Sequence, residues 1–287
     1  MKWLFRFSAT ILLIGLAAGP TRADMAYGVT LIGNQLIAVD TATGAGALVG
    51  PLTGNVAPFG LAGFNNQLYT FDSTADVVRQ ISTTSGATLN SYNINVGSVL
   101  GQGGLAFQTS TVGYLTTALD PATFNPANNL YRFDLATGST TLISQTADTL
   151  ASIAFAANGT FYGLGKLDGN LYRIDSTSGA MDLVGNVGVA IGSPVGALTF
   201  GTNGTLYATL DDALYTLNLT TGLATAIGDP NVGTGFASIS GLAFSTSTLP
   251  SVGGAVPEPA SVVLLLAGVA APVGLHFARK LRARWAA

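Results

Sequence analysis

One stretch of the chain reads SIAFAANGTFYGLGKLDGNLYRIDSTSGAMDLVG, residues 152–185. It contains four short runs rich in apolar and aromatic residues. Asn-Gly follows the first run, and the glycine-ended turn DSTSG follows the third. Short runs bounded by turn residues indicate β-strands, and no helical periodicity interrupts them. This stretch therefore predicts one unit of strand–turn–strand–loop–strand–turn–strand.

The run that opens this unit occurs five times along the chain. Its phenylalanines are separated by 43, 48, 45 and 44 residues. A period of about 40–50 residues is typical of four-stranded propeller blades. An open β-solenoid or a β-sandwich is the alternative. The five copies are GLAGF (60–64), GLAF (104–107), SIAF (152–155), ALTF (197–200) and GLAF (241–244).

The first and last units complete each other. The first unit, residues 26–50, has three strand-like runs and lacks the opening GLAF-type run. The last such run, residues 241–244, has no strands after it. We therefore predict an all-β fold, a five-bladed propeller over residues 24–249, in which N- and C-terminal strands close the ring within one blade.

The turns follow a common pattern. Four units have a short polar residue at the start of the turn before the last strand and a glycine at its end. A side-chain oxygen at that position accepts backbone N–H groups, so these residues are predicted to be turn caps. The Asn-Gly pairs at 158–159 and 203–204 predict two-residue type I′ turns. The turn-opening residues are Asp40, Asp134, Asp175 and Asn218.

Composition limits the chemistry of residues 24–249. The 287-residue chain has no cysteine, its one histidine and one glutamate lie beyond this region, and the region carries four basic and 13 acidic residues, a net charge of −9. Ser-His-Asp, Cys-His and histidine-metal sites are therefore excluded. A negative surface disfavours nucleic acid. We expect no catalytic residue, no resident metal and no cofactor, with neutral polymers, cations or other proteins as partners.

One unit has a longer loop between its second and third strands. The segment LDPATFNPAN (119–128) separates equivalent tyrosines by 17 residues, against 10 and 8 in the next two units. In a propeller this loop shares a face with the segments that join the blades. Asp120, Phe124 and Asn125 on this insertion are the candidate binding residues.

Residues 1–23 have the pattern of a secretory signal peptide. Lys2 and Arg6 precede a short apolar run, and small residues, Thr21 and Ala23, stand at positions −3 and −1 of a cleavage site. A membrane anchor is the alternative, but the run is only about 10 residues long and a span needs about 20. The sequence therefore predicts export.

The C-terminus has the length of a membrane span. Residues 260–278 contain no lysine, arginine, aspartate or glutamate, and a helix of this length extends about 28 Å. The tail that follows, residues 279–287, is predicted to stay in the cytoplasm because basic residues beside a span do so. The cluster that stops transfer consists of Arg279, Lys280, Arg282 and Arg284.

The linker before this span, residues 250–259, holds the only glutamate of the chain. Glu258 lies within VPEPAS, residues 256–261, and the two prolines keep the strip extended. This motif, the span and the basic end together resemble the PEP-CTERM sorting domain of Gram-negative bacteria. The resemblance covers about 30 residues and implies processing by exosortase, a membrane cysteine protease. The implied recognition residues are Val256, Pro257, Glu258 and Pro259.

The resemblance also implies a location and a setting. Such proteins are anchored transiently in the inner membrane and then reach the cell surface or the extracellular space, together with exopolysaccharide and biofilm matrix. We therefore expect a non-enzymatic binding or structural protein, whose partner is exopolysaccharide or a matrix protein. The alternative is a calcium-dependent propeller hydrolase or lactonase with aspartate ligands.

Overall fold

The computed structural model describes residues 25–54, 57–96, 103–119, 126–191, 196–230 and 238–245. All of them belong to one compact unit. They form twenty strands and no helix, so none of the described residues forms a helix able to span a membrane. The predicted signal peptide, linker, span and basic tail lie outside the described residues.

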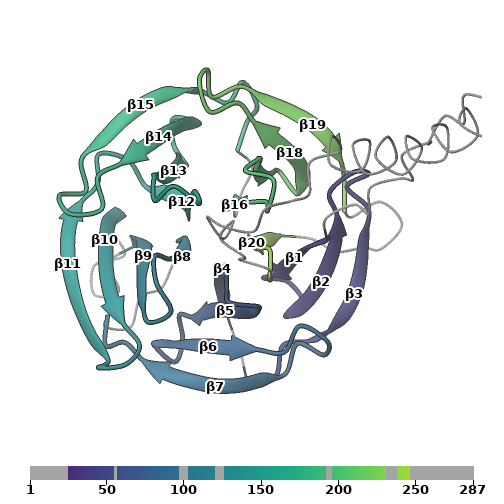
Figure 1. The fold of residues 1–287 in the computed structure, drawn as a ribbon, viewed down its shortest axis with the longest axis vertical. Coiled ribbons are helices and arrows are strands. Elements are labelled where there is room, and N and C mark those ends of the chain that lie inside the picture. The colour runs from purple at the N-terminus through teal and green to yellow at the C-terminus, as the bar shows by residue number, and fades with distance from the viewer. Residues whose placement is uncertain are drawn as a thin grey trace, which may run out of the picture. The chain divides into compact units, whose positions relative to one another are not determined.

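The strands form five separate four-stranded antiparallel sheets around one ring (Figure 1). We number these blades along the chain. Blade 1 has β20 (Ile239–Ala243), β1 (Met25–Thr30), β2 (Gln35–Asp40) and β3 (Gly46–Pro51), and blade 2 has β4 (Pro58–Phe64), β5 (Gln67–Asp72), β6 (Val77–Ile81) and β7 (Thr88–Asn93). Blade 3 has β8 (Leu105–Phe107), β9 (Val112–Leu119), β10 (Pro126–Asp134) and β11 (Ser139–Gln145). Blade 4 has β12 (Leu150–Phe155), β13 (Phe161–Gly165), β14 (Asn170–Ile174) and β15 (Met181–Asn186), and blade 5 has β16 (Ala197–Phe200), β17 (Leu206–Leu210), β18 (Ala213–Leu217) and β19 (Ala224–Gly228).

Blade 1 closes the ring as the sequence predicted. Its inner strand β20 comes from the end of the described chain and pairs antiparallel with β1, with Gly28 opposite Leu242. The hydroxyl of Ser240 on β20 also donates to the carbonyl of Pro58 at 2.7 Å, which joins blade 1 to blade 2. The predicted five-bladed all-β propeller is thus confirmed.

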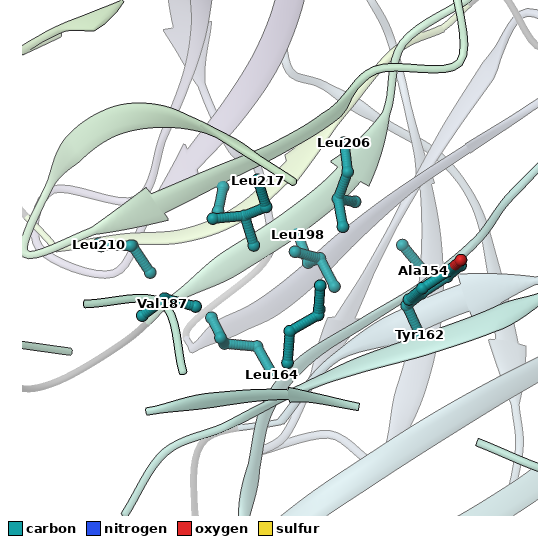
Figure 2. Close-up of a cluster of buried hydrophobic side chains, with 10 residues drawn as sticks. Ala154, Tyr162, Leu164, Val187, Leu198, Leu206, Leu210 and Leu217 are labelled. Carbon is teal, nitrogen blue, oxygen red and sulfur yellow. The ribbon is translucent and has the colours of Figure 1, made fainter. Parts of the chain in front are cut away.

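The core lies between neighbouring blades, which explains why both faces of the inner strands are apolar. Five buried clusters fill the five interfaces. Figure 2 shows the cluster between blades 4 and 5, where Tyr162 and Leu164 face Leu198 and Leu206. Each Å² of apolar surface buried at these interfaces stabilises the ring by about 25 cal/mol.

The phenylalanine of four of the five repeated motifs packs on a tyrosine of the preceding blade. This pairing recurs at four interfaces, with ring centroids 4.7–5.6 Å apart. The tyrosine is the third residue of the second strand or close to it, so one repeated aromatic pair sets the distance between blades. The pairs are Tyr69–Phe107, Tyr114–Phe155, Tyr162–Phe200 and Tyr207–Phe244.

The first residue of each repeated motif is small because the next inner strand lies very close. A Cβ on Gly104 would stand 2.4 Å from the backbone nitrogen of Ile153 and 2.7 Å from the Cα of Ser152. Ser152 itself, at the same place in blade 4, accepts a hydrogen bond from the N–H of Leu198 in blade 5 at 2.9 Å. The inner strands are thus in near-backbone contact.

The predicted turn caps are confirmed. Oδ1 of Asp40 accepts the N–H groups of Ala42 and Thr43 at 2.8 and 3.1 Å, and Asn218 does the same in blade 5. Hydrogen bonds from the N–H groups of Ser178 and Thr177 lower the pKa of Asp175. These residues therefore serve the fold.

The predicted type I′ conformation of the two Asn-Gly turns is wrong. In each turn the glycine, and not the asparagine, has positive φ, 83° at Gly159 and 78° at Gly204. The N–H of Gly159 donates to the carbonyl of Ala156, and Oδ1 of Asn158 accepts the N–H of Thr160. The turn is thus closed by a hydrogen bond to the asparagine side chain and needs only one residue with positive φ. Paired positive φ values, as in a type I′ turn, occur instead at Asn65-Asn66 and Asp211-Asp212.

Candidate binding face

The turns joining second and third strands lie against the segments that join the blades. The N–H of Lys166, in the turn after β13, donates to the carbonyl of Thr149, just before β12, at 2.7 Å. In blade 5 the carboxylate of Asp212 accepts the N–H groups of Ser238 and Ile239 at 3.0 and 2.9 Å. We call this side of the ring the loop face, and it is where the sequence placed the candidate binding surface.

Most sequence-predicted functional residues lie outside the described residues. These include the sorting motif (256–259), the cleavage-site residues Thr21 and Ala23, the basic cluster at 279–284, and Asp120, Phe124 and Asn125 on the insertion. The structure does describe the base of the insertion. Strand β9 ends at Leu119 and pairs there with Pro126 at the start of β10, so the insertion leaves and re-enters blade 3 on the loop face.

A short connection, Thr146–Thr149, runs from blade 3 to blade 4 beside this base, and we call it the strap. The N–H and hydroxyl of Thr146 donate to the carbonyl of Asn128 at 2.6 and 2.8 Å. The hydroxyl of Thr149 donates to the side-chain oxygen of Asn128. The strap is therefore fastened on one side to the residue that ends the insertion.

On its other side the strap is fastened by Asp148, which is buried, with only 7% of the residue exposed. Its Oδ1 accepts the N–H of Thr149 at 2.7 Å. Its Oδ2 accepts the N–H groups of Leu167 and Asp168, in the turn between β13 and β14, at 3.3 and 3.4 Å. A buried carboxylate needs such donors because desolvation of an unpaired charge is costly.

A second carboxylate, Asp168, lies beside the first in a polar cluster of blade 4. It accepts the backbone and side-chain N–H groups of Asn170 at 2.9 and 2.8 Å, and the hydroxyl of Tyr172. The side chain of Asn186 on β15 donates to the Asp168 carbonyl at 2.8 Å and to Oδ1 of Asn170 at 3.0 Å. Exposed Leu167, at the tip of the same turn, adds an apolar surface.

The two carboxylates meet above Gly165. A Cβ there would stand 2.4 Å from Oδ1 of Asp168 and 2.5 Å from Oδ2 of Asp148. Any side chain at this position would push the two carboxylates apart. The glycine that ends β13 is therefore a requirement of the pair.

The pKa values of the two carboxyl groups move in opposite directions. Burial raises the pKa of Asp148, and the hydrogen bond and the charge of Asp168 raise it further. Burial alone would raise the pKa of Asp168, but hydrogen bonds from the Tyr172 hydroxyl, from Asn170 and from Asp148 outweigh it and lower that pKa. Burial, together with the hydrogen bond to Asp168, raises the pKa of Tyr172.

Sequence reasoning missed this cluster. In the sequence, Asp148 and Asp168 contribute only to the overall charge, because the repeat assigns a role only to the aspartates that open its turns. The available signal was position. Neither residue occupies the turn-opening place that Asp134 and Asp175 occupy, and two aspartates outside a repeat are better candidates for a specific role than those inside it.

Two of the four basic residues of the propeller are bound within it. Arg79 donates through Nε and Nη2 to Oδ2 of buried Asp72, at 3.0 and 2.8 Å. Nη2 of Arg173 donates to the carbonyl of Leu219 in blade 5 at 3.5 Å. Within the described ranges, no three Asp, Glu, His or Cys side chains gather as a metal site.

Comparisons with known proteins give distant structural neighbours and one family model. Three solved structures with low identity cover most of the chain. The nidogen/laminin complex matches at 12% identity and a TM-score of 0.48, over 78% of this chain and 99% of that one. A gluconolactonase from Xanthomonas campestris matches at 14% and 0.46, over 73% and 77%. A streptogramin B lyase matches at 14% and 0.45, over 74% and 71%.

At the level of sequence the result is narrower. No curated protein matches the chain. A family model described as a "Repeat of unknown function (DUF6923)" matches residues 92–241, which run from β7 through blades 3, 4 and 5 to the inner strand of blade 1.

Proposed function

The chain belongs to the family of repeats of unknown function DUF6923, and we propose that it is an exported propeller that binds a matrix ligand on its loop face. The ligand class is a neutral exopolysaccharide or a matrix protein. Sorting occurs through the C-terminal tail, with exosortase as the processing enzyme. The protein acts by binding and not by catalysis.

The observation that carries the proposal is the break in the repeat on one face. The insertion base at Asn128, the strap and the polar cluster around Asp168 lie together at the junction of blades 3 and 4. Carboxylate, amide and phenol groups beside an exposed leucine suit a ligand with many hydroxyls and apolar ring faces. A face that differs between blades is a better candidate for recognition than turns that repeat in every blade.

The first test is binding to isolated exopolysaccharide. Replacing Asp120, Phe124 and Asn125 together by alanine is expected to weaken retention of the purified propeller at least about tenfold, which corresponds to about 1.4 kcal/mol. The control replaces Thr177 and Thr220, exposed in turns on the opposite face, by alanine. The loop-face hypothesis is wrong if both variants are retained like the parent protein, and polysaccharide is excluded as the ligand if the parent protein is not retained.

The alternative function, a calcium-dependent hydrolase, is favoured by one observation, the meeting of two carboxylates above Gly165. Calcium prefers six to eight oxygen ligands, which Asp148 and Asp168 alone do not supply. We therefore expect no change of melting temperature when calcium is titrated into chelator-treated protein, with magnesium as the matched control. A rise of several degrees with calcium alone, lost in Asp168→Asn, would favour the hydrolase.

A further inference from the structure

A continuous series of hydrogen bonds crosses from blade 3 to blade 4 on the loop face. It begins at Asn128, passes through Thr146 and Thr149 of the strap, and reaches the turn after β13 through Asp148. The only acidic side chain of the strap is Asp148, and it meets a second acid, Asp168, at the far end. The strap thus meets blade 4 at a pair of acidic side chains.

We propose that Asp148 and Asp168 form a pH-sensitive clamp, which fastens the strap to the β13–β14 turn when the pair holds one proton and loosens when that proton is lost. In the singly protonated state, one carboxyl group donates its proton to the other carboxylate, so the pair is attractive. When a hydroxide or buffer base removes that proton, two negative charges face each other across a buried contact and repel.

The surroundings determine which carboxyl group holds the proton. Asp148 is 7% exposed, whereas Asp168 is exposed and receives the Tyr172 hydroxyl and two N–H groups of Asn170. The proton therefore rests on Asp148. Among the described residues, the titratable group that interacts with this pair is Tyr172 on β14, and Lys166 lies on the same turn as Asp168.

The direction of the pH effect follows from these positions. The pKa of Asp148 is higher in the closed clamp than in an open one, so its contribution to closure is full at acidic pH and is lost as the pH rises through its raised pKa. The pKa of Asp168 is lower in the closed clamp, so its contribution is lost as the pH falls through that lowered value. Closure is therefore strongest in the acidic window between the two values.

The clamp bears on ligand binding only if the proposed function is correct. Because the strap also holds Asn128, loosening it releases one of the supports of the insertion base. The clamp itself can be measured without a ligand, so failure of the clamp and failure of the binding proposal are separate results.

The test is amide hydrogen exchange of the full propeller at a series of pH values, corrected for intrinsic exchange rates. We expect the protection factors of the Leu167 and Asp168 amides to fall by up to about tenfold per pH unit as Asp148 ionises. In Asp148→Asn the side-chain amide donates to Asp168 at every pH, so this fall should disappear. The exposed carboxylate of Asp182 on β15 provides the control, and Asp182→Asn should behave like the parent protein.

A second variant guards against misfolding of the first. In Asp168→Asn the facing negative charge is removed, so the fall should shrink or move to lower pH. The proposal is overturned if the protection factors of the parent protein do not change with pH. It is also overturned if Asp148→Asn or Asp168→Asn has the same pH profile as the parent protein.

Discussion

Replacing Gly104 by alanine is expected to lower the free energy of unfolding by about 3 kcal/mol or more. The added Cβ would stand 2.4 Å from the backbone nitrogen of Ile153, and backbone of a packed inner strand cannot move aside as a flexible side chain would. For a domain of this size the loss corresponds to a fall in melting temperature of about 6–12 °C. Calorimetry or circular dichroism of the purified propeller measures it.

The matched control is Gly196→Ala. Gly196 immediately precedes the inner strand β16, and an alanine Cβ there would have ordinary or slightly close contacts of 3.3–3.5 Å with Leu164, Thr209 and Ala151. We expect this variant to melt within a few degrees of the parent protein. Equal melting temperatures for the two variants would contradict the close approach of inner strands described above.

The ring could be predicted from the sequence because the same contacts recur in every blade. The phenylalanine motif, the following tyrosine and the small first residue each fill one place in an interface between blades, so their spacing reports the blade length. Closure could be predicted because the first unit lacks an inner strand and the last GLAF run lacks the three strands that follow it elsewhere. Repetition makes such features visible without an atomic model.

Features that occur once, or that depend on exact backbone angles, could not be predicted. The Asn-Gly turns are not type I′ as expected. At the first of them, Oδ1 of Asn158 accepts the N–H of Thr160, and Asn158 does not have a positive φ. The contact of Asp148 with Asp168 joins residues 20 positions apart across a blade connection. Neither the repeat period nor the composition of the chain predicts that contact.

Glu258→Ala is expected to have the largest effect on function. Glu258 is the only glutamate of the chain and lies between Pro257 and Pro259, ahead of an uncharged stretch of 19 residues. Proline removes a backbone N–H donor and disfavours a helical conformation of the residue before it, and the carboxylate is the only charge within VPEPAS that an enzyme could recognise. Removing that charge should abolish exosortase processing, so that the full-length protein accumulates in the inner membrane.

The control for this variant is Ser251→Ala, which changes a small polar residue of the same linker and leaves the motif intact. It should be processed like the parent chain. The melting temperature of the propeller should be the same in all three proteins, because both changes lie outside the ring. Loss of processing in Glu258→Ala alone therefore reports on recognition and not on folding.

The most direct test of the proposed function is to follow the mass and location of the full chain in a Gram-negative host that has exosortase. Cells are fractionated, and the propeller is followed by immunoblot and intact mass. We predict that the parent chain appears outside the inner membrane, shortened near Glu258, and that Glu258→Ala stays in the inner membrane with its tail. An unshortened parent chain, or the same processing in both proteins, would contradict the assignment of this protein as an exported, sorted propeller.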